Sequence, residues 1–223
     1  MVHRGVIFDL DGTLIDSMGI WQEVPDQLVR RLGGEPEPGL ADLLATRDLR
    51  GGAEQLIERY GWPLTPDQVL AEADRLLDEV YGSQVALKPG AAELVRRLHE
   101  MGVRLCIATA STETQARGSM AHYGLEDCFD FMLSCTEYGG KNKPDIFLEA
   151  ARRFDLPPAE ILLVEDSLYS VRTAKKAGFT TVGVADDSAP EAEREEMARS
   201  CDRFIGSLTA FDWSLITGEP HTF

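Results

Sequence analysis

The sequence is short of basic residues, and this shortage limits the partners that the protein can have. It contains 22 Lys and Arg residues against 38 Asp and Glu residues, for a formal net charge of −16. A surface of that sign repels nucleic acid and anionic membranes at long range, so neither is expected as a partner. A site for an anionic substrate would then need positive charge gathered locally, from a metal ion or from a few Lys and Arg residues.

Cysteine is also scarce, and the few that occur do not form a recognisable motif. The spacing of Cys106, Cys128, Cys135 and Cys201 contains no C-x-x-C pair and no zinc-type cluster with histidine. We therefore expect free thiols, which suit a cytoplasmic protein. The sequence has no apolar run of about 18 residues that could span a membrane, and the residues before Gly5 do not resemble a signal peptide. A monomer is the default expectation.

Five short apolar runs predict the strands of a parallel sheet. Each has four to six residues rich in Val, Ile, Leu or Phe and lacks strict alternation, as is typical of strands buried on both faces. Amphipathic stretches that predict helices lie between them, and this alternation indicates an α/β fold with a doubly wound, Rossmann-like parallel sheet. The predicted strands are Gly5–Leu10, Val103–Ala108, Phe131–Cys135, Ile161–Val164 and Thr181–Val184, and the predicted helices are Ala91–Met101, Thr112–Tyr123, Pro144–Phe154 and Leu168–Ala177.

Residues 17–86 depart from this pattern, because they show helical periodicity and almost no strand signal. They predict a helical cap domain inserted into a core formed by residues 1–16 and 87–223. Glycine-containing stretches, namely Gly33-Gly34, Gly51-Gly52 and Gly61-Trp62-Pro63, are expected to separate its helices. The four predicted cap helices are Trp21–Leu32, Leu40–Thr46, Ala53–Tyr60 and Pro66–Tyr81.

Polar side chains follow four of the predicted strands. Ligands in open parallel sheets bind at the carboxyl ends of the strands, so these side chains are expected to converge at one edge. They are Asp9 and Asp11 at the end of the first strand, Thr109 to Ser111 after the second, Lys141 and Lys143 after the third, and Glu165 and Asp166 after the fourth.

The acidic residues among them predict a magnesium site. Asp9 and Asp11 lie two residues apart, and carboxylates that close to one another stay ionised most easily beside a cation. Glu165 and Asp166 would complete a set of oxygen ligands of the kind that Mg²⁺ prefers. Lys141 or Lys143 would add positive charge for a transferring phosphoryl group, and spacing alone does not separate these two lysines.

Four ordered motifs resemble the haloacid dehalogenase superfamily, and specifically its β-phosphoglucomutase-like branch. They cover nearly the whole chain, and a helical segment follows the first of them, as in that branch. The motifs are V-I-F-D-L-D-G-T-L-I-D-S at Val6–Ser17, I-A-T-A-S at Ile107–Ser111, G-K-N-K-P-D-I-F at Gly140–Phe147 and L-V-E-D-S at Leu163–Ser167. The resemblance implies a Mg²⁺-dependent phosphatase that acts on a small, sugar-phosphate-like metabolite.

The resemblance also implies roles for the residues of the first motif. Asp9 would be the nucleophile that forms an aspartyl-phosphate. Asp11 would act as general acid and then as general base, and would bind Mg²⁺ through its carbonyl oxygen.

Roles for the other three motifs follow in the same way. Thr109 would hold the phosphoryl group with help from the backbone at Ala110 and Ser111. Lys141 matches the family lysine, since Pro144 follows it by three residues as in family members. Asp166, together with Glu165, would complete the metal shell.

Comparison with the patterns of individual family branches reduces the number of reactions that this chain is expected to catalyse. Asp11 argues against dehalogenation, because a halide leaves without a proton. A phosphonatase needs a lysine in the cap, and no lysine precedes Lys88. Related mutases carry a histidine near the start of the cap where this chain has Trp21, which favours a phosphatase.

Two other readings stay open. A hexose-phosphate mutase would need to bind a second phosphate, for which the cap offers Arg47 and Arg50; with Trp21, these are the candidate substrate contacts of the cap. A non-catalytic binding protein on the same fold would not need to keep all of the motif residues.

Overall fold

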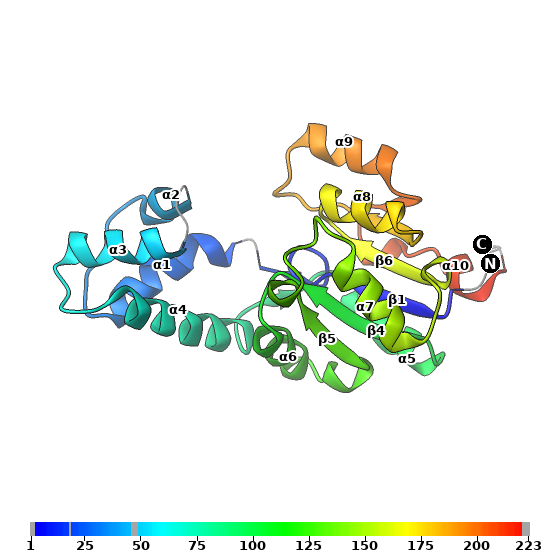
Figure 1. Cartoon of the computed structure of the whole chain (residues 1–223), viewed down its shortest axis with the longest axis horizontal. Helices are drawn as coiled ribbons and strands as arrows, with labels where there is room; N and C mark the ends of the chain where they lie inside the picture. The colour runs from blue at the N-terminus through cyan, green and yellow to red at the C-terminus, as the bar shows by residue number, and fades with distance from the viewer. Residues whose placement is uncertain (1–2, 18, 46–48, 220–223) are drawn as a thin grey trace.

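The computed structural model describes residues 3–17, 19–45 and 49–219, which form two parts. One part is a parallel sheet covered by helices on both faces, and the other is a group of four helices that extends to one side of it (Figure 1). This arrangement confirms the predicted α/β core with a helical insertion.

Six parallel strands form the sheet, in the spatial order β5-β4-β1-β6-β7-β8. The strand order reverses at β1, which is where a doubly wound sheet places its ligand site. Five strands agree with the predicted ones to within two residues at either end, whereas β8, which has three residues, was not predicted. The strands are β1 Gly5–Phe8, β4 Arg104–Thr109, β5 Phe131–Ser134, β6 Ile161–Glu165, β7 Thr180–Val184 and β8 Arg203–Ile205.

Alternate residues of each central strand enter different apolar clusters. In β1, Val6 and Phe8 belong to the cluster that includes Leu94 and Ala116, whereas Ile7 packs with Phe147 and its neighbours on the other face. The helices of the core are α5 Ala91–Glu100, α6 Glu113–His122, α7 Asp145–Phe154, α8 Leu168–Lys176, α9 Glu191–Ser200 and α10 Ser214–Thr217. Burial on both faces explains the continuous apolar runs in the sequence.

Four helices make up the other part, namely α1 Ile20–Arg31, α2 Leu40–Ala45, α3 Leu49–Tyr60 and α4 Pro66–Tyr81. The bounds of α4 agree with the prediction, and its start carries a capping box between Thr65 and Gln68. The prediction for α3 was wrong at its start. Gly51 and Gly52 lie inside this helix and do not separate it from the preceding one, since tertiary packing, including burial of Gly52, outweighs the poor helix propensity of glycine.

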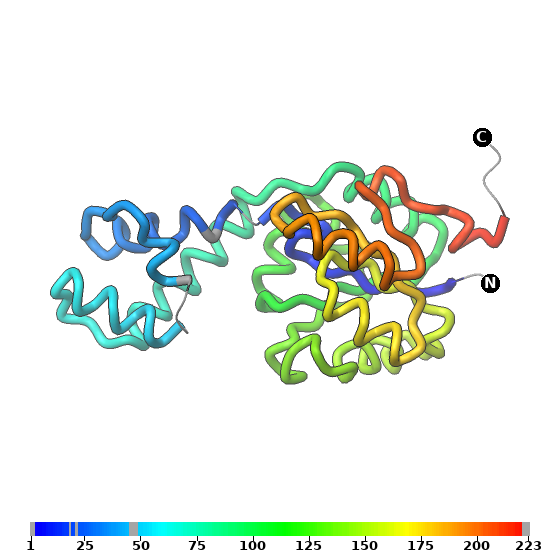
Figure 2. Tube along the Cα trace, turned by 90° about the horizontal axis from the view of Figure 1, so that it is seen from above, coloured from blue at the N-terminus to red at the C-terminus, as the bar shows by residue number. Residues whose placement is uncertain are grey.

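The chain passes between the two parts twice (Figure 2). The two passages pair with each other as a short antiparallel ribbon of β2 (Ile15–Asp16) and β3 (Ala86–Leu87). The predicted domain boundaries at residues 16/17 and 86/87 fall at this ribbon, and as domain boundaries they stay a prediction. Within the described ranges, no helix combines the length and hydrophobicity that crossing a bilayer requires.

Candidate active site

Asp9 lies at the carboxyl end of the central strand. It directly follows β1, and its backbone N–H donates to the carbonyl oxygen of Val164 at 2.9 Å, which continues the pairing of β1 with β6. Its side chain is buried. Rigid strands on either side thus fix the position of this carboxylate.

Lys141 reaches the same point from the loop after β5. Its ammonium group donates to Asp9 Oδ1 and, at 3.0 Å, to Glu165 Oε1. Lys141 is 4% exposed, whereas Lys143 lies at the surface. Burial alone would lower the pKa of the Lys141 ammonium, but the adjacent Asp9 and Glu165 carboxylates raise it above its usual value. The structure therefore brings Lys141, and not Lys143, to Asp9.

Three carboxyl groups meet beside this lysine. Ligand oxygens of Asp9, Glu165 and Asp166 all lie within 4.8 Å of one another. Burial and the neighbouring Glu165 raise the pKa of Asp9 to about 7 and that of Asp166 to about 10. One lysine does not balance three clustered carboxylates, two of them buried, and oxygen donors gathered in this way suit a hard divalent cation. The residues present therefore fit a metal ion such as Mg²⁺.

Glu165 is the most constrained of the three acids. While Oε1 accepts from Lys141, Oε2 accepts from the backbone N–H groups of Asp166 at 2.8 Å and Ser167 at 3.1 Å. These amides come directly before helix α8, whose N-terminal partial positive charge favours an anion. Despite complete burial, the Lys141 ammonium and, among other donors, the backbone N–H of Ser167 hold the pKa of Glu165 below its usual value. Glu165 thus anchors both Lys141 and the start of α8.

A tight turn after Asp11 lets the backbone pass close to Asp166. Gly12 has φ of 82°, and a Cβ atom at this position would lie 2.3 Å from Asp166 Oδ2. The next residue, Thr13, donates from its hydroxyl to Asp166 Oδ1 at 3.2 Å. Only glycine fits this turn without displacing the Asp166 carboxylate.

Asp11 has a different set of partners. Its Oδ1 accepts from the hydroxyls of Ser17 and Tyr81, each at 2.6 Å. Its Oδ2 accepts from the hydroxyls of Ser111 at 2.6 Å and Thr109 at 3.4 Å. Sequence reasoning missed Tyr81, because a tyrosine near the end of an amphipathic helix resembles an ordinary core residue.

The residues after β4 lie next to Asp11. Thr109, the last residue of this strand, is buried, and its hydroxyl oxygen accepts from the backbone N–H of Ser111 at 3.0 Å. Ala110 is exposed between them. Two of the predicted phosphoryl-binding residues, Thr109 and Ser111, therefore border Asp11.

Of the candidate contacts of the cap, Arg50 is paired with acidic residues of the cap itself. Arg50 lies on α3, where its guanidinium contacts Asp67 at 2.9 Å and Glu54 at 3.6 Å. Arg47 and the side chain of Trp21 lie outside the described residues. Their predicted roles stay predictions.

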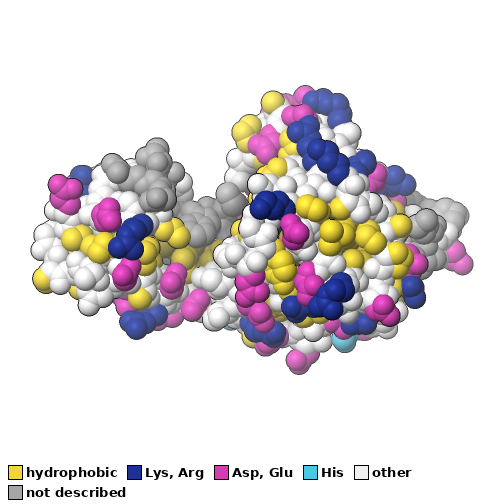
Figure 3. Space-filling view, viewed as in Figure 1, with side chains coloured by type: hydrophobic (Ala, Val, Ile, Leu, Met, Phe, Trp, Pro, Cys, Tyr) yellow, Lys and Arg dark blue, Asp and Glu magenta, His cyan; other side chains and the backbone are white. Residues whose placement is uncertain are grey.

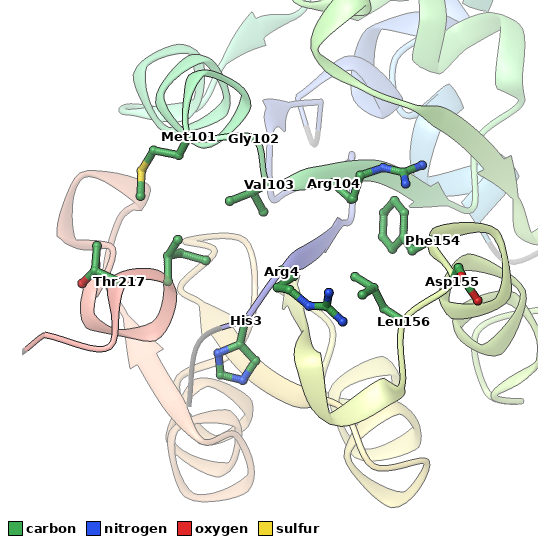
Figure 4. Close-up of a pocket in the computed structure, with 11 residues that line it drawn as sticks. His3, Arg4, Met101, Gly102, Val103, Arg104, Phe154, Asp155, Leu156 and Thr217 are labelled. Atoms are coloured by element: carbon green, nitrogen blue, oxygen red, sulfur yellow. The ribbon is translucent and has the colours of Figure 1, made fainter.

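A separate cavity of about 700 Å³ lies at the opposite edge of the sheet (Figure 4). Residues at the amino ends of the strands line it, including His3, Arg4 and Arg104. Both arginines are already paired, Arg4 with Glu160 and Arg104 with Asp130. The acids and the lysine described above meet only at the carboxyl edge.

Comparison with known proteins places this geometry in a family context. Residues 3–178 match the model of the haloacid dehalogenase-like hydrolases. The chain is 30% identical over 229 residues to (DL)-glycerol-3-phosphatase 2 of Arabidopsis thaliana, covering 94% of this chain and 90% of that protein. It is also 30% identical over 205 residues to the bifunctional riboflavin kinase/FMN phosphatase of the same plant, covering 91% of this chain but only 53% of that protein.

A solved structure shares the fold. The crystal structure of CbbY from Rhodobacter sphaeroides, in complex with phosphate, aligns with a TM-score of 0.73 at 23% identity, covering 94% of this chain and 96% of that one. At this identity the likeness concerns the fold alone.

Proposed function

Because this chain belongs to the haloacid dehalogenase-like hydrolases and is a phosphoric monoester hydrolase among them, we propose that it hydrolyses a small, sugar-phosphate-like metabolite. The proposed reaction depends on Mg²⁺ and passes through an aspartyl-phosphate on Asp9. Two of its relatives are named as phosphatases of small metabolites, (DL)-glycerol-3-phosphatase and phosphoglycolate phosphatase.

One observation carries the proposal. The carboxyl groups of Asp9, Glu165 and Asp166 lie close enough to share one cation, and the Lys141 ammonium group contacts the first two; these four residues come from three separate segments of the chain. Burying charged groups costs folding free energy, so such a cluster indicates a functional role. Strongly raised pKa values of this kind also cluster at functional sites.

The residues divide the chemistry between them. Asp9 attacks phosphorus, so that a bond from its carboxylate to phosphorus forms while the bond to the ester oxygen breaks. Asp11 gives a proton to the departing alcohol and later takes one from the water that hydrolyses the aspartyl-phosphate. Lys141 holds Asp9 and offsets negative charge on the phosphoryl group, while Thr109, Ala110 and Ser111 bind its oxygens.

Mg²⁺ would be held by Asp9, Asp166 and the carbonyl oxygen of Asp11. When bound, it supplies positive charge that offsets the charge of the phosphoryl group. Because both Glu165 oxygens already accept hydrogen bonds, we place Glu165 as the support of Lys141 and of the metal shell.

Substrate choice is proposed to lie with the cap, taken as residues 17–86. Cap and core would enclose the substrate, with Trp21, Arg47 and Arg50 as the candidate contacts. We also propose that the protein acts as a cytoplasmic monomer; its four free thiols support the cytoplasmic location.

A screen of phosphorylated metabolites tests the proposal. Wild-type protein is incubated with Mg²⁺ and each compound, and both phosphate release and isomer formation are measured. Phosphate release that Asp9→Asn abolishes and that the exposed-site variant Asp127→Asn retains would support it. Isomer formation that outpaces release would indicate a mutase, and absence of any turnover would indicate a binding protein.

A further inference from the structure

Four hydroxyl groups surround the Asp11 carboxylate, and they come from Ser17, Tyr81, Thr109 and Ser111. We refer to these four residues as the hydroxyl cluster. Each Asp11 oxygen accepts from two of them, at distances between 2.6 and 3.4 Å. Hydrogen bonds to both of its oxygens fix the orientation of the Asp11 carboxylate.

The chemical type of these partners sets Asp11 apart from the neighbouring acids. Asp9 and Glu165 are held by an ammonium group and backbone N–H groups, which only donate. A hydroxyl can donate to a carboxylate and also accept from a carboxylic acid. The partners of Asp11 therefore suit both of its protonation states, as an acid–base residue requires.

The hydrogen bonds within the hydroxyl cluster can change direction. The hydroxyl oxygen of Ser111 lies 2.6 Å from Asp11 Oδ2 and 3.3 Å from the hydroxyl oxygen of Tyr81. Tyr81 can turn its single hydrogen toward Ser111 and then accept from a protonated Asp11. Burial and the neighbouring Asp11 carboxylate raise the pKa of Tyr81, which keeps it a neutral hydroxyl.

The two partners of Asp11 Oδ1 come from the two passages between core and cap. Ser17 directly follows β2, and Tyr81 is the last residue of α4, shortly before β3. Both side chains are almost completely buried, with residue exposures of 0% and 1%. Pairing of β2 with β3 keeps the two passages together. The positions of Ser17 and Tyr81 therefore set the orientation of Asp11 Oδ1.

We propose that Ser17 and Tyr81 are positioning residues for the acid–base step, a role that rests on the phosphatase function proposed above. They hold Asp11 so that its proton passes to the leaving oxygen as the phosphorus–oxygen bond breaks. In the second half of the reaction, Asp11 takes a proton from the attacking water. The hydrogen bonds of the hydroxyl cluster then change direction to suit the protonated acid. Neither residue touches the substrate in this role.

The dependence of rate on the leaving group tests this role. A nitrophenolate leaves with little help from an acid, whereas a methylphenolate needs the proton from Asp11. We therefore compare kcat/KM for p-nitrophenyl phosphate and p-methylphenyl phosphate, with Mg²⁺, in wild type, Tyr81→Phe and Ser17→Ala. Each variant is expected to lose about tenfold on the methylphenyl ester and less than about twofold on the nitrophenyl ester.

Tyr60→Phe is the matched control, because it removes another buried cap hydroxyl, and this one has no hydrogen-bond partner among the described residues. It should leave the ratio of the two rates unchanged, and Asp11→Asn should change the ratio most. An equal fall on both esters, or an unchanged ratio in both Tyr81→Phe and Ser17→Ala, overturns the positioning role. So does a changed ratio in Tyr60→Phe.

The two proposals fail differently. If wild-type protein releases no phosphate from either ester, or if Asp9→Asn releases as much as wild type, the proposed function falls and the positioning role falls with it. If wild type is active and Asp9→Asn inactive while the ratios stay constant, only the positioning role is wrong.

Discussion

The carboxyl edge of the core and the cap hold their charged groups in opposite ways. At the core edge, Lys141 is 4% exposed and contacts two buried carboxylates. In the cap, the Arg50 side chain is 60% exposed, and that of its partner Asp67 is 78% exposed. Buried charges interact strongly because water does not screen them, whereas exposed ion pairs contribute little. The core edge therefore fixes the chemistry, and substitutions there should have larger effects than those in the cap.

The surface of the cap supports this contrast. On the face shown in Figure 3, basic and acidic side chains of the cap lie next to one another. Arg31 contacts Glu79 at 2.7 Å, and Arg59 pairs with Glu37. Tyr81, at the end of α4, is buried instead, and its hydroxyl contacts Asp11.

The largest effect is expected from Lys141→Met. Removing the ammonium group leaves the buried Asp9 and Glu165 carboxylates without their shared partner and the phosphoryl group without its counter-charge. We expect kcat/KM for the best substrate in the screen to fall about 10²- to 10³-fold. Lys143→Met, at an exposed position two residues away, should change it less than about threefold. Similar losses in both variants would contradict the assignment of the buried lysine.

The next effect concerns Mg²⁺ and pH. Folding raises the pKa values of Asp9 to about 7 and of Asp166 to about 10. A carboxyl group whose pKa is raised by folding contributes its full stabilisation at pH values below its pKa in the unfolded chain, which is about 4. That stability is lost as pH rises through about 7 and about 10. The metal-free protein should lose stability over this range.

Mg²⁺ should reverse that loss, because it binds the ionised carboxylates. We expect saturating Mg²⁺ to raise Tm by roughly 5 °C near pH 8 and by clearly less near pH 6. Thermal unfolding with and without Mg²⁺ at both pH values measures this. An equal rise at both values would show that these carboxyl groups are not the metal ligands.

A smaller effect is expected from a pair of glycine substitutions. Gly12→Ala and Gly33→Ala introduce a side chain at nearly the same backbone angle, φ of 82° and 83°, so each should cost about 1–2 kcal/mol of unfolding free energy. Only the Cβ atom at residue 12 meets Asp166; the one at residue 33, in the cap, has no described atom within 4 Å.

Gly12→Ala should therefore raise the Mg²⁺ concentration for half-maximal activity about tenfold. Gly33→Ala should leave it unchanged. Unfolding curves and Mg²⁺ titrations of both variants separate backbone strain from damage to the site. A matching Mg²⁺ requirement in the two variants would argue against the close approach of Gly12 to the metal ligands.

The smallest effect is expected from Arg50→Ala. Its surface ion pairs should contribute less than about 0.5 kcal/mol to the free energy of unfolding. As a proposed substrate contact, Arg50 should affect binding more than chemistry, so KM should rise a few-fold while kcat stays constant. Arg59→Ala is the control, since this cap arginine is also ion-paired. A constant KM in Arg50→Ala would remove Arg50 from the substrate site.

The sequence by itself determined the fold class, five of the six sheet strands and the residues that meet around Asp9. These features depend on local signals, such as the apolar runs, the helix-ending glycines and the polar residues that follow each strand. Parallel strands place their carboxyl ends at one edge, so the convergence of Asp9, Thr109, Lys141 and Asp166 could be inferred before any coordinates.

Only the tertiary structure decided which side chains surround each acid. It selected Lys141 over Lys143 by burial, placed Gly51 and Gly52 inside α3, and added the short edge strand β8. It also brought Tyr81 to Asp11 across 70 residues of sequence. Contacts of this kind depend on how α4 packs against the core, and a local sequence pattern holds no information about a partner so distant along the chain.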